Sequence, residues 1–395
     1  MSRGIRGWDE SDVRVRANKR GSRPRTKERP AHEDAVIGRV VTVDRGRYTA
    51  RIGEGSTARE VTAVRAKDLR RTPVVTGDLV GLVGDVTGDP GSLARLVRVQ
   101  PRETVLRRSA DDTDPVERVV VANAQILVIV TAAADPQPRT GFVDRSIVAA
   151  VHAGLRPVLC VTKTDLADPA PLLSYYAGTD LPILLSRRDE APEAAPETPA
   201  APAKATDDAA ADDAAAIDEA QSRSLPLDGR LLADLRALLD GRVSVLLGHS
   251  GVGKSTLVNA LTGARRSTGG VNAVTGRGRH TSSSALALQP AWGEPGTWII
   301  DTPGIRSFGL AHVPAEGIVA AFEDLAPGAA ACPKGCTHAA DAIGCGIAER
   351  VASRAAGPAG AARLDSLRRL LGVEAPDGVA GTKRLGAGAD EDPVR

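Results

Sequence analysis

The chain has 395 residues, which excludes a single ordinary core and predicts two or three domains. Apolar residues make up 42% of it and aromatic residues only 2%, so its cores should consist of small aliphatic side chains. The 51 Lys and Arg residues nearly balance the 49 Asp and Glu residues, so the net charge does not indicate a binding partner. Charged partners must instead be inferred from where like charges cluster along the chain.

The sequence predicts a cytosolic protein without membrane association. Its longest apolar run, Ala124–Ala134, is too short to span a bilayer. The N-terminus has no basic start followed by an apolar stretch and a small-residue cleavage site. Since thiols stay reduced in the cytosol, the four cysteines are not expected to form disulfides.

Residues 1–34 are predicted to form a disordered basic arm, because they combine a dense run of cations with few apolar side chains. Either this arm contacts nucleic-acid phosphates, or it is a solvated leader without a partner. The cations are Arg14, Arg16, Lys19, Arg20, Arg23, Arg25 and Lys27, among others.

Residues 35–105 are predicted to form a small β-barrel of the oligonucleotide-binding (OB) type. The short β-type runs are VIGRVVTV, RYTARI, AREVTAV, DLVGLVGDV and SLARLVRV, separated by Gly, Asp and Pro. An SH3-like barrel or another small β-domain fits the pattern as well. Sparse aromatic residues argue against base stacking as the main mode of binding.

Residues 106–309 are predicted to form one α/β domain with a parallel sheet covered on both faces. Apolar strand patterns such as RPVLCVT and LPILLS alternate with helical patterns at Phe142–Ala153 and Leu231–Leu239. The Ala-, Pro-, Glu- and Asp-rich residues 187–224 form an insertion within this domain.

The stretch TKTD follows one of these strands and is predicted to bind a guanine base. A carboxylate accepts two hydrogen bonds from the N1 and N2 donors of guanine, a pair that adenine lacks. Asp165 would supply this carboxylate, and the stem of Lys163 would lie along the base, with Thr162 and Thr164 beside them. GTP is therefore favoured over ATP.

A phosphate-binding loop is predicted at GHSGVGKS, which matches GxxxxGK[ST] between an apolar strand and a helical pattern. Its glycines let backbone N–H groups turn toward phosphate oxygens, and the helix start adds favourable partial charge. Lys254 should reach the β and γ phosphates, and the Ser255 hydroxyl should bind magnesium. The predicted contacts are Gly248, His249, Ser250, Gly251, Val252, Gly253, Lys254, Ser255 and Thr256.

Two later segments are predicted to complete the magnesium site. In TWIIDTPGIRSFG a hydrophobic strand ends at Asp301, which can hold a magnesium-bound water, and the Gly304 N–H can contact the γ phosphate. In GRGRHTSSS, Thr281 is positioned to coordinate magnesium. Because such Ser/Thr-rich loops are common without this role, the assignment of Thr281 depends on the neighbouring motifs.

These motifs occur in an unusual order. In ordinary small GTPases the phosphate loop comes first and the base-reading [NT]KxD last, whereas here TKTD precedes the phosphate loop. The order predicts a circularly permuted GTPase domain, in which joining the old termini preserves the packing of the sheet.

The stretch CPKGCTHAADAIGC predicts a structural zinc site. Cys332, Cys336, His338 and Cys345 supply four ligands, which close a tetrahedral site and leave no open position for catalysis. The alternative is a group of reduced thiols without metal. Cys160 lies in an apolar strand and is expected to be a small core residue.

Together these motifs resemble the ribosome small-subunit-dependent GTPase A (RsgA) family of circularly permuted GTPases, over about Val36 to Val373. The resemblance implies an OB barrel, the permuted GTPase domain, a zinc-binding helical domain at 310–375 and, here, a disordered tail at 376–395. It also implies GTP as substrate, magnesium, one structural zinc ion, and the small ribosomal subunit with its rRNA as partner of a monomeric protein.

The chain departs from the family pattern at several positions. The first gap between zinc ligands is shorter by one residue and the last is longer by one, His249 replaces a common Gln, and the insertion is atypical. The resemblance implies that His280 helps to position the attacking water, with Lys254 and Thr281 as further catalytic residues; His280 could equally be a solvated loop residue. Since Ile305 follows DTPG and cannot orient water, slow intrinsic hydrolysis is expected.

Three functions are compatible with the sequence. The first is a GTPase that acts in late maturation of the small ribosomal subunit and is stimulated by it. The second is a GTP-dependent rRNA-binding latch in which hydrolysis is incidental. The third is a P-loop ATPase or kinase, although no acceptor site or lid is evident and TKTD would then be accidental.

Overall fold

The computed structural model describes residues 32–69, 72–109, 116–186, 227–264, 285–302 and 308–373. Most of the predicted basic arm, the insertion 187–224 and the tail 376–395 lie outside these ranges. Within the described ranges, no helix combines the length and the hydrophobicity needed to cross a membrane.

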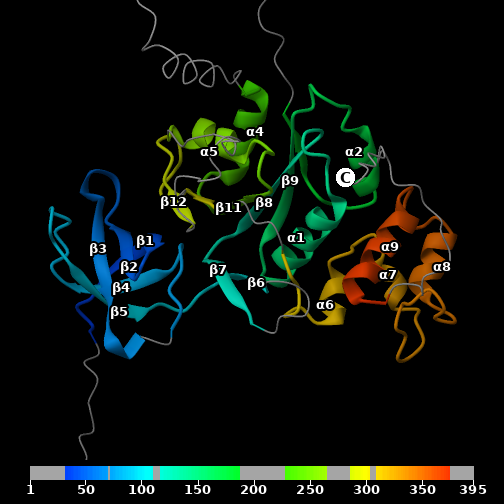
Figure 1. Cartoon of the computed structure of the whole chain (residues 1–395), viewed down its shortest axis with the longest axis horizontal. Helices are drawn as coiled ribbons and strands as arrows, with labels where there is room; N and C mark the ends of the chain where they lie inside the picture. The colour runs from blue at the N-terminus through cyan, green and yellow to red at the C-terminus, as the bar shows by residue number, and fades with distance from the viewer. Residues whose placement is uncertain are drawn as a thin grey trace, which may run out of the picture. The chain divides into compact units, whose positions relative to one another are not determined.

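The N-terminal strands close into a barrel, as predicted (Figure 1). Strand β1 pairs with both β2 and β4, while β3 pairs with β2 and with β5, and β5 pairs with β4. This circuit, with a parallel β3–β5 pair, is the OB arrangement. Its strands are β1 (Val36–Asp44), β2 (Arg47–Ile52), β3 (Arg59–Arg65), β4 (Leu79–Gly84) and β5 (Ala94–Val99).

A hairpin of β6 (Val105–Arg108) and β7 (Arg118–Ala122) follows the barrel. The apolar run that begins in β7 is interrupted at Asn123, whose φ of 58° lies in the left-handed region. The Asn123 side chain holds this turn, because it accepts from the Glu103 N–H at 2.9 Å and donates to the Gly77 carbonyl at 3.1 Å. The chain therefore enters the central sheet as a separate strand.

The central sheet has the strand order β10-β9-β8-β11-β13-β12, and β12 also pairs with β1 of the barrel. All neighbours within the central sheet are parallel except the β12–β13 pair. The strand that precedes the phosphate loop, β11, thus lies between β8 and β13, as the permuted order predicts. The strands are β8 (Ile126–Ala132), β9 (Arg156–Thr162), β10 (Ile183–Leu185), β11 (Val243–Gly248), β12 (Leu286–Leu288) and β13 (Trp298–Asp301).

Helices cover both faces of this sheet, and its central strands are therefore buried along their whole length. On one face lie α4 (Gly229–Leu239) and α5 (Lys254–Thr262), and Leu231, Leu235 and Leu239 of α4 form the buried stripe. On the other face lie α1 (Thr140–His152) and α2 (Ala170–Tyr176), whose buried side chains share a core with the C-terminal helices.

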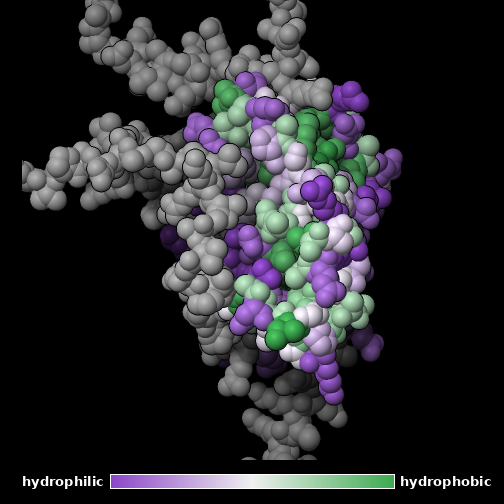
Figure 2. Space-filling model, turned by 90° about the vertical axis from the view of Figure 1, so that its right-hand side faces the viewer, coloured by the Kyte–Doolittle hydropathy of each residue, from purple (hydrophilic) through white to green (hydrophobic). Residues whose placement is uncertain are grey.

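The C-terminal region is helical, with α6 (Ala315–Ala320), α7 (Ala326–Ala329), α8 (Gly346–Ala352) and α9 (Gly360–Leu371). Helices α7 and α8 approach closely because both carry glycine at the contact: a Cβ on Gly346 would lie 2.4 Å from the Gly328 carbonyl oxygen. On the face that Figure 2 shows, hydrophobic and hydrophilic residues are interspersed. The barrel, the permuted α/β domain and this helical region agree with the predicted fold class.

Candidate nucleotide and metal sites

The predicted phosphate loop connects β11 to α5, and its glycines are required by the backbone. Gly251 and Gly253 have φ of 84° and 85°, which other residues adopt at a cost. A Cβ on Gly248 would lie 2.6 Å from the Val130 carbonyl oxygen, so only glycine allows β11 to approach β8 here. Ser255 and Thr256 follow in the first turn of α5, and Ser250 is exposed in the loop.

Lys254 and Asp301, which lie on separate motifs, are in direct contact. Lys254 is the first residue of α5 and Asp301 the last of β13, and both side chains are buried. The Lys254 ammonium donates to the Asp301 carboxylate and to the Thr302 carbonyl, the latter at 2.5 Å. The Thr302 hydroxyl donates to the Leu246 carbonyl at 2.7 Å and so ties the end of β13 to β11.

TKTD lies beside the phosphate loop. The buried Thr162 hydroxyl, at the end of β9, donates to the Val252 carbonyl of the phosphate loop at 2.7 Å, although the two residues are 90 positions apart. A Cβ on Gly253 would lie 3.6 Å from this hydroxyl oxygen. Asp165 is exposed three residues further on. The structure therefore brings the predicted base-reading and phosphate-binding segments to one edge of the sheet.

Sequence reasoning missed two segments at this edge. Ser186 follows β10, and its carbonyl accepts from the Thr164 hydroxyl of TKTD. The loop after β8 also contacts both motifs, because the Lys163 ammonium donates to the Asp135 carbonyl and a Cβ on Gly251 would lie 3.7 Å from Pro136 Cδ. Ser186, the last residue of LPILLS, could have been predicted to lie at this edge, because parallel strands all end at the same edge of a sheet. The loop at Asp135 contains no motif from which its position could have been predicted.

His249, within the phosphate loop, packs against helix α1. Its ring centroid lies 4.0 Å from that of Phe142, and its buried Nε2 has no hydrogen-bond partner in the part of the chain that the structure describes. Burial lowers the pKa of His249, and the nearby charge of Arg139 lowers it further, so the imidazole is neutral at pH 7. The phosphate loop thus contacts α1 through an aromatic pair.

The remaining predicted residues of the nucleotide site are His280, Thr281 and Gly304. All of them lie outside the described residues, as does Ile305.

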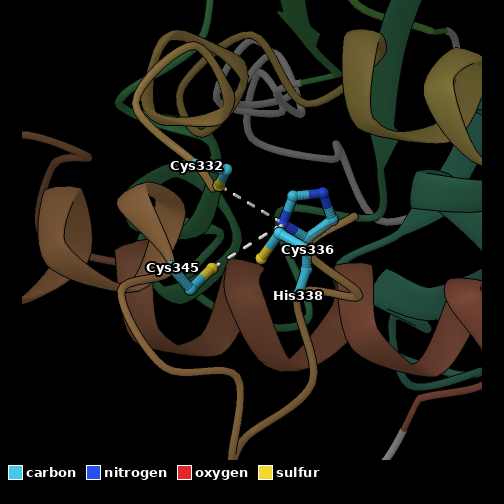
Figure 3. Close-up of side chains that lie close together, drawn as sticks. All are labelled: Cys332, Cys336, His338 and Cys345. Carbon is cyan, nitrogen blue, oxygen red and sulfur yellow. Dashed lines mark hydrogen bonds between the residues drawn. The ribbon is translucent and has the colours of Figure 1, made fainter. Parts of the chain in front are cut away.

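The predicted zinc ligands converge (Figure 3), and their ligand atoms all lie within 4.8 Å of one another. His338 Nδ1 lies 3.7 Å from Cys332 Sγ, 3.6 Å from Cys336 Sγ and 3.7 Å from Cys345 Sγ. With Zn–S and Zn–N bonds of about 2.3 and 2.05 Å, a tetrahedral site has S···N edges of about 3.6 Å. The four residues therefore match the size and donor chemistry of a closed zinc site.

Neighbouring groups shift the pKa values of two of the ligands, Cys332 and His338, toward the forms that bind metal. Burial raises the pKa of Cys332, but the backbone N–H groups of Ile347 and Gly346 at the start of α8, together with hydrogen bonds from Cys336 and Cys345, outweigh it and hold the pKa below its usual value. Burial and the charge of Arg368 lower the pKa of His338, which keeps its imidazole neutral. A stabilised thiolate and a neutral imidazole are the forms that bind zinc.

If these residues hold zinc, removing the metal or replacing Cys345 with Ser is expected to increase hydrogen exchange in residues 332–352, because the loop and the start of α8 would then share one ion. Exchange mass spectrometry with and without a chelator, together with metal analysis, measures this effect. Cys160→Ala is the matched control: burial raises the pKa of Cys160 to about 12, and its thiol lies in the core of β9. Unchanged exchange in a zinc-free protein would contradict a structural site.

The RsgA GTPase family model matches residues 99–195 and 204–311, just over half of the chain. The chain is 33% identical over 257 residues to the small ribosomal subunit biogenesis GTPase RsgA of Pseudomonas aeruginosa. It is 35% identical over 257 residues to the Pseudomonas fluorescens protein of the same name. Each alignment covers 63% of this chain and 61% of the relative.

Solved structures support the fold. The crystal structure of YjeQ from Thermotoga maritima matches with a TM-score of 0.56 and 21% identity, over 85% of this chain and 99% of that one. YloQ, described as a circularly permuted GTPase, matches with a TM-score of 0.54 and 18% identity, over 87% and 96%. The order of the motifs, their meeting at one sheet edge and the match to the family model lead to one conclusion: this chain belongs to the RsgA GTPase family.

Proposed function

We propose that this protein is a GTPase that binds the small ribosomal subunit and acts in its late maturation, hydrolysing GTP to GDP and phosphate with stimulation by the subunit. The observation that carries the proposal is the hydrogen bond from Thr162 to Val252, which joins the base-reading and phosphate-binding segments. Further support comes from relatives named as small ribosomal subunit biogenesis GTPases.

In this proposal Asp165 and Lys163 hold guanine, while backbone N–H groups of Gly251 to Lys254 surround the phosphates. Lys254 exchanges its contact with Asp301 for the β and γ phosphates. A magnesium ion held at this site would supply positive charge to neutralise the charge that develops between these phosphates. Ser255, Thr281 and Asp301 would hold the ion or its water.

Hydrolysis requires a water in line with the γ phosphate. We propose that His280 helps to position this water and that the Gly304 N–H contacts the γ phosphate. The side chain of Ile305 has no hydrogen-bonding atom to orient water. Turnover would therefore be slow in the free protein and faster on the subunit, which gives the partner control over hydrolysis.

The OB barrel and the basic arm would contact rRNA phosphates, which bind cations irrespective of sequence. The barrel carries exposed arginines that could meet such phosphates, among them Arg45, Arg47, Arg59 and Arg95. We propose domains at 35–105, 106–309 and 310–375, one zinc ion, a monomer, and a cytoplasmic location, where ribosomal subunits mature.

The decisive experiment measures GTP hydrolysis with and without purified small subunits, using ATP and large subunits as controls. We expect slow basal turnover, strong stimulation by small subunits only, and no comparable hydrolysis of ATP. A nonhydrolysable GTP analogue should retain the protein on the subunit, whereas GDP should release it. Nucleotide-dependent retention without stimulation of hydrolysis would favour the latch, and equal hydrolysis of ATP would contradict the proposal.

A further inference from the structure

A buried arginine on the last helix joins three parts of the fold. Arg363 of α9 is 2% exposed and donates from NH1 to Asp144 of α1 at 2.7 Å. Its Nε and NH2 donate to both carboxylate oxygens of Asp324, between α6 and α7, at 3.0 and 2.9 Å. Its guanidinium carbon lies 4.5 Å from the ring centroid of Phe322. Each of its three guanidinium nitrogens therefore donates to a carboxylate inside the protein.

Asp144 collects further donors from two helices. It accepts from the Tyr175 hydroxyl at 2.8 Å and the Tyr176 hydroxyl at 3.0 Å, both on α2. It also accepts from the Ser366 hydroxyl of α9 at 2.5 Å. We call Asp144, Tyr175, Tyr176, Asp324, Arg363 and Ser366 the Arg363 cluster. Through this cluster α9 and α2 are both hydrogen-bonded to the Asp144 carboxylate of α1.

Both of these helices lead directly to the nucleotide site. In the first turn of α1, two residues before Asp144, Phe142 packs on His249 of the phosphate loop at 4.0 Å. Helix α2 begins at Ala170, five residues after Asp165, and ends at Tyr176. The Arg363 cluster therefore fixes the positions of the helix behind the phosphate loop and of the helix that follows TKTD.

The charged and hydrogen-bonding groups of the Arg363 cluster keep their protonation states near neutral pH, so the cluster is not a pH sensor. Burial lowers the pKa of Arg363, but the hydrogen bond to Asp324 and the charges of Asp144 and Asp324 outweigh it and raise the pKa above its usual value. Burial and the charge of Asp144 raise the pKa of Tyr175 and Tyr176, so both hydroxyls remain donors. The geometry is fixed by charge-assisted hydrogen bonds, which are directional.

We propose that Arg363 is a positioning residue of the nucleotide site, acting through Asp144 on α1 and through the two tyrosines on α2. This inference rests on the proposed binding of guanine nucleotide. Because coupling between two sites is reciprocal, nucleotide binding must also stabilise the attachment of α9. Arg368 of α9 donates to the His338 carbonyl at 2.9 Å, so the effect reaches the zinc-binding loop.

The test compares Arg363→Lys, Tyr175→Phe and Ser366→Ala with Arg369→Lys, an exposed position on the same helix. Lysine keeps the charge of Arg363 but cannot form its forked hydrogen bonds. We expect Arg363→Lys to raise the dissociation constant of fluorescent GDP about 10-fold and the milder variants about 3-fold, with Arg369→Lys unchanged. Should Arg363→Lys fail to fold, the two milder variants carry the test.

Hydrogen exchange separates positioning from a general loss of stability. In the unmodified protein, GDP is expected to slow exchange of the α9 amides several-fold, and Arg363→Lys should reduce this protection even at saturating GDP. The inference would be overturned if the folded variants bound GDP within twofold of the unmodified protein and GDP did not change hydrogen exchange in α9. This result would leave the proposed function intact. Failure of the unmodified protein to bind GDP would overturn both.

Discussion

Replacing Asp165 with Asn is expected to weaken GTP and GDP binding on the order of 100-fold while ATP binding stays at its low level. In the proposed site the Asp165 carboxylate accepts hydrogen bonds from two guanine N–H donors. Exchanging one carboxylate oxygen for an amide NH2 would remove one of these charge-assisted bonds and place two donors opposite each other. This change costs about 3 kcal/mol. Equilibrium binding of fluorescent GDP, GTP and ATP derivatives measures the selectivity directly.

Asp168→Asn is the matched control, because Asp168 is also exposed and lies three residues after Asp165. Its side chain caps the Ala170 N–H at 2.9 Å, a role that Asn retains. A xanthine nucleotide should partly recover binding to Asp165→Asn, since its 2-oxo group accepts from the new amide. If GTP and ATP affinities fell equally, TKTD would not be reading the base.

Replacing Lys254 with Met is expected to lower GTP hydrolysis more than 100-fold. The ammonium is the phosphate loop's only side-chain cation, and Met preserves its length without charge. The same change removes the ammonium from the buried Asp301 carboxylate, which should lower the free energy of unfolding by about 3 kcal/mol. Single-turnover hydrolysis and chemical denaturation without nucleotide measure the two effects separately.

Combining Lys254→Met with Asp301→Asn distinguishes stability from catalysis. Neutralising both partners should recover most of the lost unfolding free energy, because no carboxylate is left facing an apolar side chain. Hydrolysis should remain low in the double variant, since it lacks both the cation proposed to contact the phosphates and the carboxylate proposed to hold a magnesium-bound water. Recovery of turnover together with stability would show that Lys254 acts only in folding.

Local sequence predicted the parts of the nucleotide site because each part is a short strand–loop–helix unit. Gly251 and Gly253 are needed for backbone conformations that can be inferred from the loop pattern, and the apolar runs before TKTD and before Asp301 predict buried parallel strands. The spacing of the zinc ligands likewise predicted a closed group, since four donors within one loop can meet around one ion.

Sequence predicted that these units form one nucleotide site, but it could not predict which side chains join them. The hydrogen bond from Thr162 to Val252 depends on the order β9-β8-β11, which results from packing of the whole sheet. The loop at Asp135 and the Arg363 cluster have no motif, and Asp144 alone within the amphipathic pattern of α1 indicates only a polar residue on a helix. Its partners come from 31 to 222 positions away, where sequence spacing carries no information.

Sequence alone determined which chemical groups this protein carries: a phosphate-loop pattern, the TKTD carboxylate predicted to read guanine and four predicted zinc ligands, each encoded within a few neighbouring residues. Tertiary structure decided which of them meet. It brings TKTD to the phosphate loop and binds α9 to the helices behind both. The physical reason is that backbone conformation depends on local residues, whereas a buried hydrogen bond exists only when distant elements pack to exclude water around it.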